Sequence, residues 1–123
     1  MKIKAKQVKF DNYVEMASPE LLWLGESGQP YRGTLYVQYN TTNKMTVDMI
    51  SFKKYITSLR SETVLLEDIA SFIANDLKET LDNDNVAVTV KSAARGGISS
   101  TITNGNTNFK DPQSKPLVFG LGV

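Results

Sequence analysis

Two consecutive helical segments in the middle of the chain, with strand-like runs on both sides, constrain the fold more than any other feature. In residues 69–81 the apolar side chains recur every three or four positions, which is the spacing of one buried helical face. Residues 52–59 show the same spacing, and Ser51 before them is a favoured helix cap. A chain of 123 residues is one domain by size, so we expect both helices to cover one sheet.

Alternation of apolar and polar residues predicts strands before and after the helices. Period two indicates half-buried strands at residues 2–10, 33–39 and 86–91. The segment Lys44 to Ile50 is expected to return beside 33–39 after a polar loop. The β-branched run 98–103 predicts the last strand. The order strand, strand, helix, helix, strand, strand therefore predicts an α+β fold.

Two segments lie outside this alternation. Ser18-Pro19-Glu20 predicts the start of a helix or turn, because serine is a favoured cap and proline a favoured first helical residue. We expect a domain over residues 1–104 and a loop or tail over 105–123. The tail contains the apolar run Leu117–Val123, which we expect to dock on its own core or on a neighbouring subunit.

Composition removes several classes of chemistry. The sequence contains no cysteine and no histidine, which excludes disulfides, thiolate nucleophiles, Cys/His zinc sites and histidine acid–base catalysis. We expect no catalytic residue of those kinds and no metal. A net charge of +1 predicts no nucleic-acid partner. Without an apolar run of membrane length or a signal segment, we expect no membrane association and a cytoplasmic location.

Three segments together carry a family resemblance. They are Ser18-Pro19-Glu20 followed by Gly28-Gln29-Pro30, Asp48 to Arg60 continued by Glu67-Asp68, and Ala94-Arg95-Gly96-Gly97-Ile98-Ser99. In order and spacing they resemble the NADPH-dependent 7-cyano-7-deazaguanine (nitrile) reductases of queuosine biosynthesis. That resemblance implies the tunnelling fold, ββααββ, in which an antiparallel sheet is backed by two helices. It also implies a homo-oligomer in which strands of several subunits close a barrel.

The resemblance further implies a ligand site. Glu67 matches the glutamate that binds the N–H edge of a purine- or pterin-like ring, a task that suits a carboxylate because it accepts two parallel hydrogen bonds. Glu67 can equally be an exposed carboxylate at a helix start. The other expected ligand-binding residues are Gln29, Ser51, Lys53, Arg95, Gly96 and Gly97. The glycines can instead serve a β-bulge, and the lysine a solvated helix face.

The departures from the family concern catalysis. Leu24-Gly25-Glu26 occupies the region of the family's nucleophilic cysteine, and Tyr31 stands at the position of its aspartate. Leu66 replaces the family's histidine, and Ile50 replaces a lysine associated with NADPH binding. We therefore expect no nitrile reduction and no cofactor, although the resemblance itself implies NADPH.

Three functions remain open from the sequence. The favoured one is a catalytically altered member of the family that binds a purine-like or nucleotide-related ligand between subunits. The second is an active enzyme of deazapurine or pterin chemistry that uses lysine or tyrosine for proton transfer. The third is a structural component of an oligomeric assembly.

Overall fold

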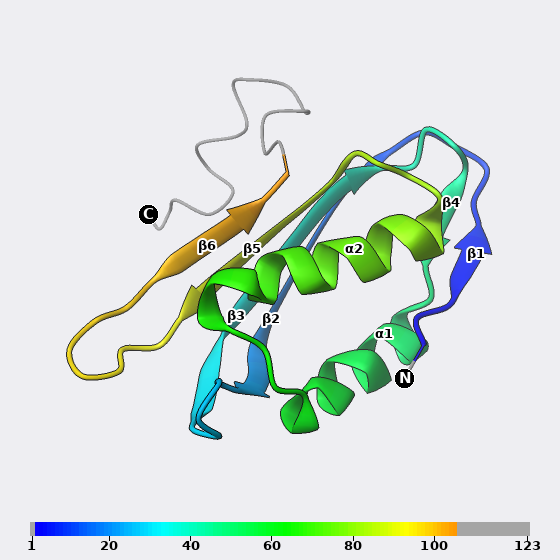
Figure 1. The fold of residues 1–123 in the computed structure, drawn as a ribbon. Coiled ribbons are helices and arrows are strands. Elements are labelled where there is room, and N and C mark those ends of the chain that lie inside the picture. The colour runs from blue at the N-terminus through cyan, green and yellow to red at the C-terminus, as the bar shows by residue number, and fades with distance from the viewer. Residues whose placement is uncertain (1, 106–123) are drawn as a thin grey trace.

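The computed structural model describes residues 2–105, which form an antiparallel sheet covered on one face by two helices (Figure 1). The elements in chain order are β1 (Ala5–Gln7), β2 (Tyr13–Leu24), β3 (Pro30–Asn40), β4 (Met45–Val47), α1 (Met49–Ser58), the 3-10 turns η1 (Leu59–Ser61) and η2 (Leu66–Asp68), α2 (Ile69–Leu81), β5 (Val86–Ser92) and β6 (Thr101–Asn104). The predicted α+β class is confirmed.

The main sheet has four strands in the order β2-β3-β5-β6, all antiparallel. Its helix-covered face holds the core, in which Tyr39, Leu35 and Val88 lie opposite the buried faces of α1 and α2. A separate two-stranded ribbon joins β1 to β4 at one end of the molecule (Figure 1). Around the main sheet the chain order is ββααββ, as the resemblance implied.

The prediction of a helix or turn start at Ser18-Pro19-Glu20 is wrong, because these residues lie inside β2. Ser18 pairs with Leu35 and Leu21 pairs with Gly33, so three steps along β2 match two along β3. This β-bulge inserts one extra residue and turns the following side chains to the other face. It directs Leu21 and Trp23 into the core, where they are 0% and 1% exposed.

The expected pairing of Lys44–Ile50 with 33–39 is also wrong. Strand β4 is short and pairs with β1, whereas β3 lies between β2 and β5. Lys44 has a positive φ of 65°, which bends the chain away from β3 before β4 begins. The predicted first strand at residues 2–10 is reduced to β1, and the last strand begins at Thr101 rather than at residue 98.

The helices agree with the apolar spacing, but the cap of the first helix differs. Asp48 caps α1 by accepting a hydrogen bond from the Ser51 backbone N–H at 3.0 Å. Ser51 is buried inside the first turn, and its hydroxyl accepts the Lys4 N–H at 2.9 Å. Ser51, the predicted cap, therefore hydrogen-bonds the N-terminal segment to α1.

Two expectations concern other parts of the chain. The apolar run Leu117–Val123 lies outside the described residues, so its docking stays a prediction. Over residues 2–105, neither helix combines the length and the apolar character that crossing a bilayer requires.

Candidate functional site

Three connections gather at the end of the molecule opposite the β1–β4 ribbon: the β2–β3 turn, the β5–β6 turn and the segment that joins α1 to α2 (Figure 1). Backbone hydrogen bonds join two of them. The Leu24 N–H donates to the Glu62 carbonyl at 2.9 Å, and the Val64 N–H donates to the Leu24 carbonyl at 2.9 Å. Leu24-Gly25-Glu26, the region that the resemblance assigns to the family's nucleophile, thus begins beside the segment that leads to Glu67.

The β2–β3 turn is fixed by Gln29. The Gly25 N–H donates to the Gln29 carbonyl at 2.7 Å, and the Ser27 hydroxyl donates to the side-chain oxygen of Gln29 at 2.5 Å. A Cβ at Gly25 would lie 2.6 Å from the ring of Tyr31 and 2.8 Å from the Gln29 side chain, so the close approach requires glycine. Within residues 2–105 the amide nitrogen of Gln29 makes no hydrogen bond, so its two N–H donors are available to a ligand.

Tyr31 stands where the resemblance implies an aspartate, and its ring forms part of a stack. The ring centroid lies 5.2 Å from that of Trp23, with the planes inclined by 17°. The Arg95 guanidinium lies 5.1 Å from the centroid of the Tyr31 ring. Aromatic and cation–π contacts at these distances are stabilising, so Tyr31 is held between a core tryptophan and an arginine.

Arg95 begins the β5–β6 turn and also contacts the β2–β3 hairpin. Its guanidinium donates to the Pro30 carbonyl at 2.5 Å. Gly96 and Gly97 have φ of 60° and 83°, and the Arg95 and Ile98 backbones exchange hydrogen bonds of 2.8 and 3.1 Å around them. These are the features of a type I′ hairpin turn, so the glycines serve a turn and not a β-bulge.

A hollow of about 430 Å³ lies between this turn and the hairpin. Arg32 and Arg95 both line it, together with Leu22 and the backbone around Ala93 and Ala94. Two guanidinium groups beside a hollow are suited to a carbonyl, carboxylate or phosphate oxygen.

Glu67 lies in η2, one turn before α2, and is exposed. Within residues 2–105 its carboxylate makes no hydrogen bond and no ion pair. The N-terminal end of α2 begins two residues later, where the helix dipole favours negative charge. The carboxylate is therefore available to an external donor.

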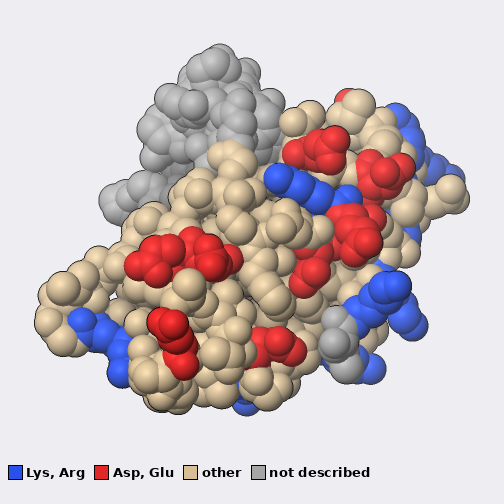
Figure 2. Space-filling view, viewed as in Figure 1, with Lys and Arg blue, Asp and Glu red and all other residues tan. Residues whose placement is uncertain are grey.

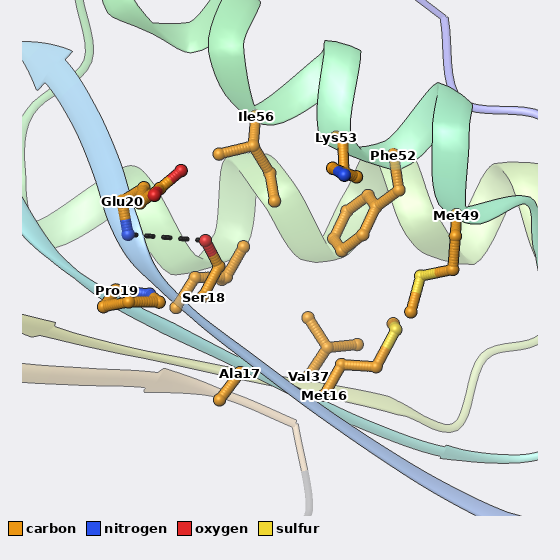
Figure 3. Close-up of a pocket in the computed structure, with 11 residues that line it drawn as sticks. Met16, Ala17, Ser18, Pro19, Glu20, Val37, Met49, Phe52, Lys53 and Ile56 are labelled. Atoms are coloured by element: carbon orange, nitrogen blue, oxygen red, sulfur yellow. Dashed lines mark hydrogen bonds between the residues drawn. The ribbon is translucent and has the colours of Figure 1, made fainter.

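The remaining two candidate residues lie apart from this end. Ser51 is engaged by Lys4 and by the Asp48 carbonyl at 3.0 Å. Lys53 is exposed and lines a groove between α1 and the middle of β2 (Figure 3). The structure thus brings Gln29 and Arg95 together through Pro30, and places Ser51 and Lys53 elsewhere.

The sequence does not indicate that Tyr31 stacks on Trp23, or that Met16, Glu20 and Met49 line a groove. The available signal is Pro19 within an otherwise strand-like segment, which marks a bulge or an edge strand.

The charge distribution is mixed. Acidic side chains lie across the helix-covered face, and basic ones lie at its ends and also among the acidic ones, without a large patch of one sign (Figure 2). Within residues 2–105, no group of three or more acidic, cysteine or histidine side chains is placed to hold a metal ion.

NADPH fits this chain poorly at the position that the resemblance indicates. Ile50 stands where the family has a lysine, and it is an apolar side chain with 66% exposure on α1. Its neighbours Lys53 and Lys54 are exposed. An alkyl group in place of an ammonium provides no charge for a phosphate.

Comparison with known proteins gives a consistent result. The family model described as QueF-like protein matches residues 30–111. An NADPH-dependent 7-cyano-7-deazaguanine reductase of Bacillus licheniformis is 36% identical over 106 residues, which are 85% of this chain and 62% of that protein. The enzyme of the same name from Chlorobium phaeovibrioides is 33% identical over 98 residues, 78% of this chain and 84% of that protein. The chain thus spans less than two thirds of the Bacillus relative and most of the Chlorobium one.

A solved structure supports the fold. The crystal structure of the archaeosine synthase QueF-Like in the apo form matches with a TM-score of 0.69 and 22% identity, over 78% of this chain and 94% of that one. At this identity the likeness establishes the ββααββ tunnelling fold, with two helices on an antiparallel sheet.

Proposed function

The chain belongs to the QueF-like family, and on that premise we propose that it is a catalytically altered member, which binds a purine- or pterin-like heterocycle between subunits and does not reduce a nitrile. The observation that carries the proposal is the stack of Trp23, Tyr31 and Arg95. It fills the position where the family places its proton-transferring aspartate with an aromatic ring.

The proposal that the protein does not reduce a nitrile is supported by the lack of an activated nucleophile among the side chains at this end of the molecule. Covalent attack on a nitrile carbon needs an activated nucleophile, and the sequence has neither cysteine nor histidine. Ser27 carries a hydroxyl in the β2–β3 turn, and this hydroxyl donates a hydrogen bond to the side-chain oxygen of Gln29. A serine hydroxyl without a neighbouring base is a weak nucleophile at neutral pH.

Ligand binding is supported by polar groups that retain hydrogen-bonding capacity within residues 2–105. Glu67 can accept two N–H donors, the Gln29 amide can donate, and the arginine-lined hollow can receive an oxygen. A heterocycle with an N–H edge and a carbonyl, as in guanine or pterin, offers the complementary groups.

Self-association is the second part of the proposal. Within residues 2–105, β2 pairs only with β3 and β6 only with β5, so both outer strands of the main sheet have an open edge. Such edges are prone to pair with another chain, and symmetric association satisfies them. We propose a homo-oligomer larger than a dimer, in which each site is completed by a neighbour.

The proposed ligand binding needs no reductant. The relatives are NADPH-dependent by name, but Ile50 removes a charge at the position linked to that cofactor. Incubation with 7-cyano-7-deazaguanine and NADPH should give no oxidation of NADPH and no covalent adduct by mass spectrometry. Steady turnover would overturn this part of the proposal.

The binding test begins with mass spectrometry of small molecules released from the native protein, followed by calorimetry with guanine, pterin and 7-cyano-7-deazaguanine. Glu67→Gln should weaken binding by about 1.5–3 kcal/mol, the usual contribution of a charge-assisted hydrogen bond. Glu79→Gln, at an exposed position near the other end of α2, is the matched control and should bind as the parent does.

Two outcomes would contradict the assignment. If the parent protein binds none of these compounds, the assembly role is favoured over ligand binding. If Glu67→Gln binds as tightly as Glu79→Gln, the heterocycle does not contact Glu67.

A further inference from the structure

The groove between α1 and the middle of β2 is separate from the proposed heterocycle site. It has a volume of about 480 Å³ and an apolar floor that includes Val37, Phe52 and Ile56 (Figure 3). Met16 and Met49 point toward each other at one end of the groove, and Glu20 and Lys53 lie along its rim (Figure 3). Methionine pairs adapt to apolar partners of irregular shape.

The groove adjoins further exposed apolar surface and a strand edge. Met49 is 52% exposed, and Ile50, the next residue of α1, is 66% exposed. Residues 16–20 of β2 form the other wall, on the open side of the sheet. A groove beside a free strand edge is the arrangement by which proteins take up an extended peptide.

We propose that this groove receives the apolar segment Leu117–Val123 of a second copy of the chain. The segment alternates large apolar residues with small ones over its second half: Phe119, Gly120, Leu121, Gly122 and Val123. In an extended chain, alternate side chains point the same way, so Phe119, Leu121 and Val123 share one face and the two glycines the other.

The dimensions and charges agree with such a peptide. From Met49 to Ile56 the helix wall extends about 10 Å at 1.5 Å per residue. Five extended residues span about 13 Å, so two or three alternate side chains fit along the wall. The segment has no charged side chain, which suits an apolar floor, and Lys115 just before it complements Glu20 on the rim.

A second copy is the better source than the same chain. Strand β6, from which the segment continues, lies at the opposite edge of the main sheet from β2, about 14 Å away at the usual strand spacing. If a neighbour's β6 edge pairs with β2, the chain that follows that β6 starts from the same edge of the sheet as the groove. The inference therefore rests on the proposed self-association.

The natural absence of cysteine permits a clean cross-linking test. Chains that carry only Met49→Cys and chains that carry only Leu121→Cys, with different tags, are co-expressed and oxidised. We expect a disulfide-linked pair of the two different chains by non-reducing mass spectrometry. Ile98→Cys, 70% exposed in the β5–β6 turn, replaces Met49→Cys in the control and should give at least tenfold less product.

A second measurement needs no cysteine. With the segment in the groove, Met16 and Met49 are shielded from peroxide, so a chain truncated before Leu117 should oxidise at both several-fold faster than the full chain. Met45 in β4, outside the groove, is the internal control and should oxidise at the same rate in both proteins.

Light scattering on the same samples separates the possible failures. An oligomer without the expected cross-link, and with unchanged methionine oxidation, overturns the groove assignment and leaves self-association standing. A cross-link that forms only when both cysteines are in one chain shows that the segment's own copy fills the groove, which overturns the second-copy assignment. A monomeric mass overturns both proposals together.

Discussion

At position 31 this protein has a tyrosine where the resemblance to the nitrile reductases implies an aspartate, one of several departures from that family. A carboxylate there can transfer a proton, whereas the Tyr31 ring is held between Trp23 and Arg95. Through the Tyr31 ring the β2–β3 hairpin contacts Arg95 of the β5–β6 turn. The substitution is readable from the sequence, but the stack is not, because cross-strand neighbours follow from register.

Gly25→Ala tests how tightly the hairpin is packed. The added Cβ would meet Tyr31 and Gln29 at 2.6 and 2.8 Å, so one of them must move. We expect a loss of stability of about 1–3 kcal/mol, the usual cost of overpacking a buried position. Gly28→Ala is an imperfect comparison because Gly28 has a φ of 83°, so Glu26→Ala, at an exposed position of the same turn, is the control. Urea unfolding that shows no difference between Gly25→Ala and Glu26→Ala would contradict the packing.

Tyr55→Phe tests a buried polar contact between the helices. The Tyr55 hydroxyl donates to an Asp76 carboxylate oxygen at 2.5 Å, and burial, followed by this bond, raises the pKa of Tyr55 well above its ordinary value of 10. The folded protein therefore keeps a proton that the unfolded chain loses above pH 10. Stability from this group is complete below pH 10 and decreases as the pH rises further.

The variant should lose about 1.5–3 kcal/mol at pH 7, as for a hydrogen bond to a charged acceptor. The difference from the parent should shrink as the pH rises above 10, measured by urea unfolding between pH 7 and 11. Burial also raises the pKa of Tyr13 to about 12, but Tyr13 is present in both proteins and cancels in the difference. A difference that stays constant across this range would contradict the link between Tyr55 and Asp76.

At the scale of elements, the sequence predicts the helices well and the first half of the sheet poorly. Helix α2 and strands β3 and β5 show uninterrupted periodicity, so their type and place follow from it. Strand β2 does not, because its bulge shifts the apolar positions from even to odd numbers between Ser18 and Leu21. A strand with such a phase change does not show one continuous period, and the polar loop at residues 40–43 suggests a hairpin with Lys44–Ile50 instead.

The bulge itself can be tested by deletion. Removing Pro19 takes out the extra residue and leaves Leu21 and Trp23 facing the core, so we expect a loss of less than about 1.5 kcal/mol, as for a conservative rearrangement. Removing Leu22 instead moves Trp23 to the opposite face. This should cost about 3–5 kcal/mol, comparable to truncating a buried tryptophan.

Both variants can be followed by the fluorescence of the single tryptophan. The Leu22 deletion should shift the emission toward that of a solvated indole, while the Pro19 deletion should keep the parent spectrum. Equal stability and equal spectra for the two deletions would show that β2 does not depend on the bulge for its orientation.

At the scale of the whole molecule, the resemblance supplied what periodicity could not. The order of the matched segments implied ββααββ, and the structure confirms that order around the main sheet. The candidate ligand residues fall at two places, with Gln29 and Arg95 at one end and Lys53 in the groove. Only a three-dimensional arrangement could separate them, because all belong to matched segments of the sequence.

The open edges of β2 and β6 give the last prediction, which concerns assembly. Ala17→Lys places an exposed charge on β2, where natural edge strands use lysine to prevent pairing with another chain. Thr57→Lys adds the same charge to an exposed position of α1 and is the control. Light scattering at micromolar concentration should give a mass above a dimer for the parent and for Thr57→Lys, and a smaller mass for Ala17→Lys.

If a neighbour completes each site, the variant with the smaller oligomer mass should also bind the ligand more weakly. Ala17→Lys should bind the heterocycle at least tenfold more weakly than Thr57→Lys while its circular dichroism spectrum remains that of the parent. A monomeric parent would contradict the assembly. An Ala17→Lys monomer that binds as tightly as the parent would show instead that one chain carries the whole site, because the loss of the neighbour then removes no contact to the ligand.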